Sequence, residues 1–237
     1  MSQIIDTNNL PKHIAITMDG NGRWAKSKGK LRAFGHKNGV TAVRDTVEAA
    51  AEIGIKFLTL YAFSTENWER PKSEVNALMT LLVSAINKET KTLMDNNIKL
   101  STIGDTESLP SKAKKELLQA IKKTKENTRM TLVLALSYSG RWEILNAAKN
   151  LINDGIDANA IDEQVFLQYL TTKSVPDPEL LIRTSGEYRI SNFLLWQIAY
   201  SELYFTDTLW PDFRRVDLEK AILNYQSRQR RFGKTTA

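Results

Sequence analysis

The chain has 237 residues, 42% of them hydrophobic and 25% charged, which is the composition of a globular protein with a substantial core. It has no cysteine and only two histidines, His13 and His36. These counts exclude disulfides, thiolate catalysis, cysteine zinc sites and a three-histidine metal centre within one chain. No apolar run approaches the roughly 18 residues of a membrane span, and the first residues lack the apolar core of a secretion signal. The sequence therefore predicts a soluble, cytoplasmic protein.

Positive charge is concentrated in two parts of the chain. There are 33 Lys and Arg against 27 Asp and Glu, a net charge of +6 at pH 7. Residues 12–37 alone carry +6 and residues 226–237 carry +4, so the remainder is net acidic. Such concentration indicates an anionic ligand, either a nucleic acid or a phosphorylated small molecule. Composition does not decide between the two.

Apolar runs that favour β-structure alternate with segments of helical periodicity. In chain order they predict a strand at 13–18, a helix around 40–50, a strand at 56–63, a long helix at 72–94, a strand at 98–103, a helix around 113–121, a strand at 130–137, a helix around 144–151 and a strand at 180–184. The segment 192–208 suits a helix or a strand equally well.

Strands that alternate with helices form βαβ units, and these assemble into parallel sheets. The strands are almost continuously apolar, as expected when both faces of the sheet are covered. The chain has no linker, repeat or low-complexity tract. We therefore predict one α/β domain over residues 1–237, with a mostly parallel central sheet flanked by helices. Ligands of such sheets bind beyond the carboxyl ends of the strands.

The first polar cluster follows the strand at 13–18 and reads Asp-Gly-Asn-Gly-Arg-Trp, from Asp19 to Trp24. Asp-Gly and Asn-Gly are common turn dipeptides, so an ordinary tight turn is one interpretation. The other is a phosphate site, because glycines let backbone N–H groups approach a phosphate and the arginine adds charge. Asp19 would oppose an anion unless a cation such as Mg²⁺ lay between them. The cluster has neither the dinucleotide fingerprint nor the P-loop pattern.

Two further clusters follow the second and fifth predicted strands. In residues 63–71 either Ser64 or Thr65 caps a helix and Pro71 opens the next one, but capping does not explain the tryptophan and the arginine in the same segment. Residues 183–192 hold two arginines and two serines, which form either an anion clamp or a solvated loop. Glu202 lies among aromatic residues and needs a partner, which a metal would provide.

Other signals are weaker when taken alone. His36 by itself indicates a packed or capping histidine, and the arginine-rich residues 228–232 indicate a solvated helix end that complements the helix dipole. Together with the three clusters, however, they predict an anion site with a divalent metal.

Five stretches of the sequence are recognisable as long motifs: MDGNGRWA (18–25), RAFGHKNG (32–39), FSTENWERP (63–71), RTSGEYRISNFLLWQIAYSELYF (183–205) and WPDF (210–213). They closely resemble the cis-prenyltransferase family, nearest to its bacterial members that make undecaprenyl diphosphate. The resemblance extends from about residue 13 to residue 233, and the motifs follow the order of the family. No DDxxD motif of the all-helical trans-prenyl synthases occurs.

The resemblance implies an enzyme that adds isopentenyl diphosphate units to farnesyl diphosphate and forms new double bonds in the cis configuration. The product would be undecaprenyl diphosphate, the precursor of the lipid carrier in peptidoglycan synthesis. The resemblance also implies a homodimer that uses Mg²⁺, binds no nucleic acid and contacts the membrane peripherally for product release. An apolar tunnel in the domain would hold the growing chain, and residues 1–12 and 233–237 would be flexible.

Position by position, the resemblance also implies roles for individual residues. Asp19 would be the essential aspartate, Asn67 the residue often assigned as proton acceptor, and Asp19 and Glu202 the metal carboxylates. The basic C-terminal tail resembles a segment that reaches toward the partner subunit's site. The implied substrate-binding residues are Gly20, Asn21, Gly22, Arg23, Trp24, Arg32 and His36, then Ser64, Thr65, Glu66, Trp68 and Arg70 in a mobile loop, and Arg183, Arg189, Ile190 and Ser191 for isopentenyl diphosphate.

One position departs from the pattern. Tyr188 stands where some members have a histidine that has been considered a metal neighbour. The metal would then be held by Asp19, Glu202, diphosphate oxygens and water, which Mg²⁺ tolerates well. A neutral amide is a poor proton acceptor, so we expect a diphosphate oxygen to take the proton and Asn67 to orient the substrate or relay the proton.

Two other classes of function remain at this point. A basic nucleic-acid-binding module would show steeply salt-dependent binding, although neither an RNP-type motif nor a helix-turn-helix pattern stands out. A non-catalytic family member that serves as a partner subunit would have lost motif residues, and this chain retains nearly all of them.

Overall fold

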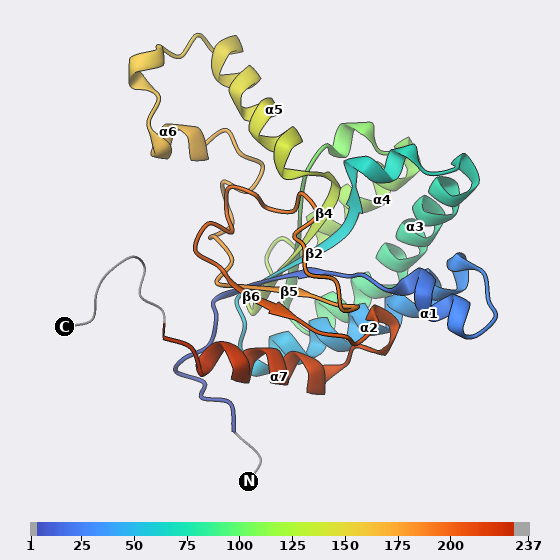
Figure 1. The fold of residues 1–237 in the computed structure, drawn as a ribbon. Helices are drawn as coiled ribbons and strands as arrows, with labels where there is room; N and C mark the ends of the chain where they lie inside the picture. The colour runs from blue at the N-terminus through green and yellow to red at the C-terminus, as the bar shows by residue number, and fades with distance from the viewer. Residues whose placement is uncertain (1–3, 230–237) are drawn as a thin grey trace.

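The computed structural model describes residues 4–229 and contains a six-stranded sheet in which all neighbouring strands are parallel (Figure 1). The strand order is β3-β4-β2-β1-β5-β6. The strands are β1 (His13–Thr17), β2 (Phe57–Ser64), β3 (Ile98–Ile103), β4 (Met130–Tyr138), β5 (Leu180–Arg183) and β6 (Glu202–Phe205). The predicted α/β class with a parallel sheet is confirmed.

Helices connect the strands and cover the sheet. They are α1 (Asn21–Ser27), α2 (Arg32–Ile53), α3 (Lys72–Asp95), α4 (Ser111–Thr124), α5 (Gly140–Asn153), α6 (Glu163–Leu167) and α7 (Arg215–Gln226). The four predicted helices correspond to α2, α3, α4 and α5. α1 and α6 were not predicted because they are too short to show a period. α7 was expected only as a helix end at residues 228–232, and it ends at Gln226, although its buried residues Leu218, Ala221, Ile222 and Tyr225 do show a helical period. No helix within residues 4–229 is long and apolar enough to cross a membrane.

The five predicted strands are confirmed, with small shifts at their ends, and β6 is an additional one. It lies within the ambiguous segment 192–208, most of which forms turns. β6 has only four residues, occupies the edge of the sheet and has no fully buried position. Because such a strand has no strong apolar alternation, its pairing with β5 is visible only in the tertiary structure.

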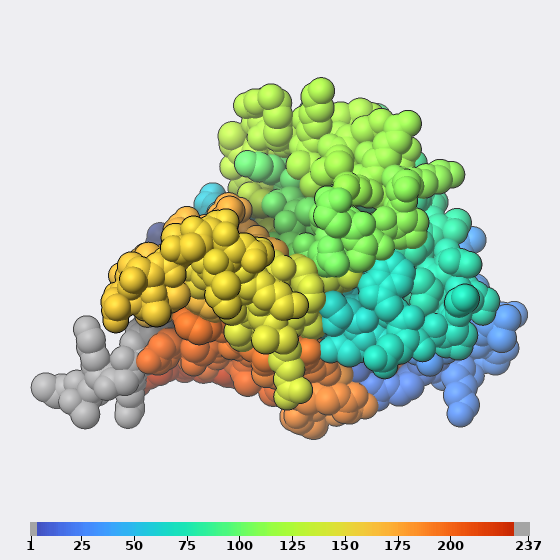
Figure 2. Space-filling view, turned by 90° about the horizontal axis from the view of Figure 1, so that it is seen from above, coloured from blue at the N-terminus to red at the C-terminus, as the bar shows by residue number. Residues whose placement is uncertain are grey.

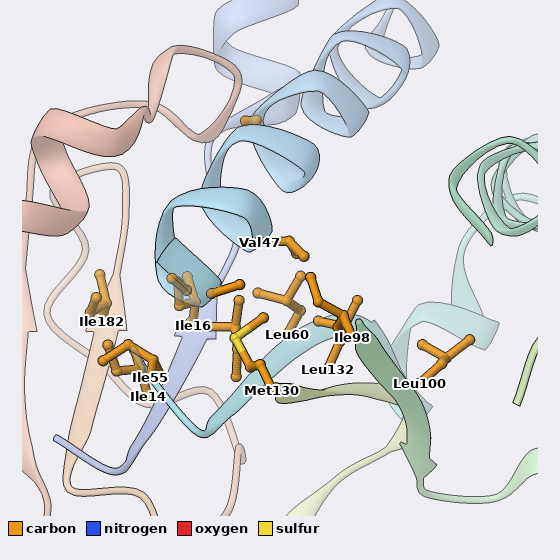
Figure 3. Packing of buried hydrophobic residues seen from close by; sticks show 14 of the residues in the cluster. Ile14, Ile16, Val47, Ile55, Leu60, Ile98, Leu100, Met130, Leu132 and Ile182 are labelled. Carbon is orange, nitrogen blue, oxygen red and sulfur yellow. The ribbon is translucent and has the colours of Figure 1, made fainter. Parts of the chain in front are cut away.

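Alternate residues of the sheet face two different cores. Ile14 and Ile16 of β1 belong to the larger core, which includes residues of α2, α3, α4 and α7, whereas Ala15 faces a smaller core with Phe193. Figure 3 shows Val47 of α2 above the side chains of the larger core. Helices α2, α3, α4 and α7 therefore cover one face of the sheet, and the loops at the carboxyl ends of the strands are left to form a site.

Candidate active site

The polar clusters after β1 and β5 meet at the carboxyl edge of the sheet, because these two strands are neighbours. The backbone N–H of Asp19 donates to Thr184 Oγ1 at 2.9 Å, and the Thr184 hydroxyl donates to the carbonyl oxygen of Asp19 at 2.7 Å. Arg183 Nη2 donates to Asp19 Oδ2 at 2.8 Å. Two clusters far apart in the sequence thus form one constellation.

Asp19 is held in its charged form. Burial alone would raise the pKa of its carboxyl group, but hydrogen bonds from Arg183 and the Gly20 N–H and the positive charge of Arg23 outweigh burial, so the pKa lies below its usual value. Arg23 Nη2 is 3.5 Å from Asp19 Oδ2, and the Asp19 side chain is 31% exposed. The carboxylate is therefore ionised and accessible, as a metal ligand must be.

Arg183 organises the loop that follows β5. The residue is only 3% exposed, and its Nη1 donates to the carbonyl oxygen of Arg189 and to Ser191 Oγ, both at 2.7 Å. Its Nε is buried without a partner among residues 4–229. Ser185 and Ser191 have φ values of +81° and +49°, in the left-handed region that residues with side chains seldom adopt. Strain of this kind is typical of ligand-binding loops.

Two more arginines lie closer to solvent. Arg23 Nη1 donates to the carbonyl oxygen of Ser185 at 3.0 Å and lies 3.1 Å from Glu187 Oε1, and Arg189 Nη1 is 2.5 Å from Glu187 Oε2. The side chains of Arg23 and Arg189 are 48% and 59% exposed. Because exposed ion pairs contribute little energy, both guanidiniums can turn from Glu187 to an incoming anion.

The cluster after β1 combines a turn with a helix. Gly20 has a φ of +107°, and a Cβ there would lie 2.9 Å from Leu209 Cδ2, so the position requires glycine. Gly20 is the N-cap of α1, and Asn21, Gly22, Arg23 and Trp24 form the start of that helix, so the turn expected at Asn-Gly is not formed. Trp24 is buried, and its Nε1 donates to Asp212 Oδ1 at 2.8 Å, so within this chain it is a packing residue of the protein interior.

The loop after β2 is a short 3₁₀ turn at Thr65–Glu69. Its capping box includes a hydrogen bond from the Ser64 backbone N–H to Asn67 Oδ1 at 3.2 Å, which confirms the capping interpretation. Thr65 Oγ1 donates to Ser139 Oγ at 2.8 Å, beyond the end of β4. The side chain of Asn67 is thus fixed by the turn, and the residue also lines a cavity.

Two side chains of this turn connect it to the other clusters. Glu66 Oε1 accepts from Asn192 Nδ2 at 2.8 Å, and Trp68 Nε1 donates to Ser137 Oγ at 2.9 Å. Burial would raise the pKa of Glu66, but the hydrogen bond from Asn192, with others, lowers it below the usual value. The segments after β2, β4 and β5 therefore form one surface at the edge of the sheet.

A cavity of about 260 Å³ extends from this edge between α2, α3 and the sheet. Asn21, His36, Asn67 and Arg70 line one polar part of it, and Arg44, Glu48 and Glu89 also contribute to its wall. Aliphatic side chains supply most of the remaining wall, among them Val43, Val47, Leu60, Leu78, Leu82, Leu132 and Leu134. A polar edge that leads into an apolar cavity suits a molecule with an anionic head and a hydrocarbon tail.

The polar end of the cavity contains unsatisfied groups. His36 Nε2 and Asn21 Oδ1 are buried without a partner among the described residues. Burial, with the nearby positive charge of Arg70, lowers the pKa of His36 to about 4, so its ring is neutral at pH 7. Arg70 and Arg32 both pair with Glu74, at 3.0 and 3.6 Å. Because buried polar groups normally have hydrogen-bond partners, these atoms mark the polar end of the cavity as a candidate ligand site.

Glu202 lies elsewhere within this chain. It pairs with Leu180 at the beginning of β5, three positions before Arg183, which places it about 10 Å from the carboxyl edge at about 3.3 Å per residue. Its carboxylate forms an ion pair with Arg228 at 2.6 Å. Tyr188 is 77% exposed, with its ring 5.2 Å from that of Phe205. A single chain therefore does not bring Glu202 to Asp19, and no group of three or more metal-binding side chains occurs within residues 4–229.

Several residues of the site were not singled out in the sequence analysis. Thr184, Glu187 and Asn192 fall inside the cluster 183–192, but nothing in their pattern distinguished them from loop residues. Ser139 follows β4, where the rule on carboxyl ends of strands could have found it. Of the implied substrate residues, Ile190 packs against the smaller core. The basic residues 230–237 of the C-terminal tail, and residues 1–3, lie outside the described part of the chain.

The fold and the site define an α/β protein with an arginine-rich sheet edge that leads into an apolar cavity. The model of a family described as "Putative undecaprenyl diphosphate synthase" matches residues 17–233. The chain therefore belongs to this prenyltransferase family, as its motifs predicted.

Similar proteins and solved structures support the assignment of the chain to this family. An isoprenyl transferase of Chlorobaculum tepidum is 55% identical over 96% of this chain and 87% of its own length. A ditrans,polycis-undecaprenyl-diphosphate synthase ((2E,6E)-farnesyl-diphosphate specific) of Pasteurella multocida is 55% identical over 97% of both chains. Lavandulyl diphosphate synthase from Lavandula x intermedia, solved in complex with dimethylallyl diphosphate, superimposes with a TM-score of 0.92 at 38% identity, covering 95% of this chain and 99% of that chain. A probable undecaprenyl diphosphate synthase from Campylobacter jejuni gives 0.80 at 34% identity, covering 95% and 100%.

Proposed function

We propose that the chain is a cis-prenyltransferase that condenses isopentenyl diphosphate units onto farnesyl diphosphate to make undecaprenyl diphosphate. The observation that carries the proposal is the junction of an arginine-rich sheet edge with an apolar cavity, because substrate and product both have a diphosphate head and a hydrocarbon tail. The name of the Pasteurella relative supports farnesyl diphosphate as the primer.

The allylic substrate is bound by the groups that surround the polar end of the cavity. Arg23 and Arg32 are exposed cations beside it, and His36 and Asn21 carry unsatisfied polar atoms. In the reaction the bond between C1 of the allylic group and its diphosphate oxygen breaks, and the electron pair leaves with the diphosphate. The guanidiniums stabilise the negative charge that grows on that oxygen.

Mg²⁺ fits this site through Asp19. A single ionised, partly exposed carboxylate is sufficient, because Mg²⁺ commonly binds one or two carboxylates, substrate phosphates and several waters. When bound, the ion supplies further stabilisation of charge on the departing diphosphate. Glu202 and Asp19 lie at different ends of the sheet within one chain. We therefore propose that a second carboxylate, if the metal uses one, comes from Glu202 of a second copy in a homodimer.

Isopentenyl diphosphate is held by the loop after β5. Arg183 positions this loop, Arg189 is free to turn toward the diphosphate, and Ser191 supplies a hydroxyl. The isopentenyl double bond attacks C1 of the allylic group, so a carbon–carbon bond forms there, and a proton then leaves the isopentenyl unit. Correct orientation of the two reactants accounts for a large part of such catalysis.

The proton requires an acceptor. Asn67 Oδ1 already accepts a hydrogen bond from the backbone of Ser64, and its amide is neutral, so it is a poor base. We assign the proton to a diphosphate oxygen, and we assign Asn67 the orientation of the substrate at the mouth of the cavity. The growing chain extends into the aliphatic part of the cavity, which serves as the start of the product tunnel.

The product is a lipid, so we place the enzyme in the cytoplasm with loose contact to the membrane for release. Binding of a nucleic acid is not proposed, because the family and the apolar cavity explain the basic clusters better. A non-catalytic partner subunit is not proposed either, because Asp19, Arg183 and Arg189 are present and form one constellation.

The test is incorporation of labelled isopentenyl diphosphate by the purified protein, with farnesyl diphosphate and Mg²⁺, followed by sizing of the lipid products. We expect a long-chain product that depends on all three components. The same chain with Asp19→Ala is the negative control. A folded protein that gives no extended product with farnesyl diphosphate or with shorter allylic diphosphates would contradict the proposal.

A further inference from the structure

The connection between α1 and α2 carries positive charge from lysines that do not belong to the candidate active site. Residues 20–43 contain six Lys and Arg and no acid. Arg23 and Arg32 belong to the site and Lys37 lies within α2, which leaves Lys26 in the last turn of α1 and Lys28 and Lys30 in the connection itself. Every residue from 26 to 34 is exposed. The three lysines form no ion pair with any carboxylate in the described part of the chain, although Lys28 Nζ lies 4.7 Å from the centre of the Trp24 ring.

An apolar group lies among these cations. Leu31 is 84% exposed, and Phe34 is 39% exposed with its ring stacked on Trp24 at 5.7 Å. A site for a soluble diphosphate needs positive charge but gains nothing from an exposed leucine. Lysines around an exposed aliphatic and an aromatic side chain are instead the pattern of a surface that binds a bilayer with anionic lipids.

The position of this connection agrees with such a role. It projects from the body of the molecule near α1 in Figure 1 and at the end of the blue segment in Figure 2. The helix that follows, α2, carries His36, Val40 and Val43, all of which line the cavity. A bilayer seated on residues 26–34 would therefore lie beside the α2 wall of the cavity that holds the lipid tail.

We propose that residues 26–34 form a docking surface for an anionic lipid bilayer, with Leu31 entering the interface and Lys26, Lys28 and Lys30 contacting the head groups. Its use for product release rests on the proposed function, but lipid binding itself does not. The surface consists of side chains that are exposed in the structure.

Helix α4 offers a matched control. It is also rich in lysine and carries an exposed Leu118, but two lysines in and beside it are paired, Lys114 with Glu107 and Lys125 with Glu126. It packs on α3 and β3, at the far edge of the sheet from β5 and β6. If binding to vesicles depends only on overall charge, removal of lysines from α4 will weaken it as much as removal from residues 26–34.

The experiment is sedimentation of the wild-type chain with vesicles of phosphatidylcholine containing 30% phosphatidylglycerol, and with pure phosphatidylcholine. We expect binding to the anionic vesicles only. The variant Lys28→Ala/Lys30→Ala should bind about 30-fold more weakly, from about 1 kcal/mol per lysine. Leu31→Ser should also lose binding. Lys122→Ala/Lys123→Ala and Ile152→Ser, which removes another exposed aliphatic side chain, should bind as wild type.

Three results would overturn the proposal: equal binding by the loop variants and the wild type, equal loss in the α4 control, or no binding of the wild type to anionic vesicles. The competing hypothesis is that residues 26–34 bind a soluble substrate and not a bilayer. That hypothesis is supported if Lys28→Ala/Lys30→Ala raises KM for a diphosphate in detergent solution and leaves vesicle binding unchanged. Vesicle binding without any prenyl transfer would contradict the proposed function and leave the docking surface intact, so the two failures are distinguishable.

Discussion

Replacement of Arg183 and of Arg189 by alanine is expected to change stability and kinetics in different ways. Arg183 is buried and donates hydrogen bonds to Asp19, to the carbonyl oxygen of Arg189 and to Ser191. Arg189 is more than half exposed, and its side chain pairs with Glu187. Arg183 therefore supports both the fold and the carboxylate of Asp19, which we propose to be catalytic, whereas the role that we propose for Arg189 is in substrate binding alone.

The magnitudes follow from burial. Breaking a buried ion pair costs about 3–5 kcal/mol, and because Asp19 is 31% exposed we take the lower end, about 3 kcal/mol, for Arg183→Ala. In a domain of this size that lowers Tm by about 6–12 °C. Arg189→Ala breaks an exposed pair that contributes about 0–1 kcal/mol. Loss of a charge-assisted hydrogen bond to the substrate, about 1.5–3 kcal/mol, raises KM for isopentenyl diphosphate by about 10- to 100-fold in Arg189→Ala. Arg183→Ala should also raise this KM, because Arg183 positions the loop that holds the substrate.

Thermal unfolding and steady-state kinetics distinguish the two variants. Arg189→Ala should raise KM for isopentenyl diphosphate at an unchanged Tm. Arg183→Ala should also lower Tm and kcat, because Asp19 loses its partner. Arg215→Ala, which removes an exposed arginine paired with Glu52 and Glu219, is the control for charge. A wild-type Tm for Arg183→Ala would refute the reasoning, and a change confined to KM for farnesyl diphosphate would show that the two pockets are assigned the wrong way round.

The remaining predictions concern the metal carboxylate, pH, helix packing and release. Asp19→Ala should nearly abolish turnover while the circular dichroism spectrum stays native; wild-type rates with a lowered Tm would instead identify Asp19 as a turn residue. Burial lowers the pKa of His13 to about 4 against 6.5 in the unfolded chain, so the unfolded state takes up a proton first as pH falls. The free energy of unfolding by urea should therefore drop by about 2 kcal/mol from pH 7.5 to pH 5 on account of His13, and His13→Asn should lose that part of the slope. A Cβ at Gly35 would lie 1.9 Å from the carbonyl oxygen of Asn21, so Gly35→Ala should push α1 away from α2. This variant should have a lower Tm and a higher KM for farnesyl diphosphate. Normal kinetics would show that the packing of α1 on α2 does not shape the site. Burial of each added five-carbon unit stabilises the bound product by up to ~4 kcal/mol, so product release should limit turnover. We expect a burst of product equal to the enzyme concentration and a steady-state rate that nonionic detergent raises. A linear time course that detergent does not change would place the slow step at the chemistry.

The sequence by itself determined the class of the fold and the composition of the site. Alternation of apolar strands with helical periods is a local signal, and it predicted a parallel sheet whose strands at 13–18, 56–63 and 180–184 end in polar clusters. The long ordered motifs were sufficient to identify the family, and Asp19, Arg183 and Ser191 were all found in them before any geometry was known.

The tertiary structure alone decided which of these residues meet. Strand order depends on contacts between distant parts of the chain, which no local period encodes, and the pairing of β5 beside β1 is what places Arg183 against Asp19. The same order, with the register of the short strand β6, puts Glu202 about 10 Å from that edge at the usual rise per residue. A motif gives the identity of a side chain, but the register of its strand decides which end of the sheet it occupies, and this is why Asp19 and Glu202 are separated within one chain.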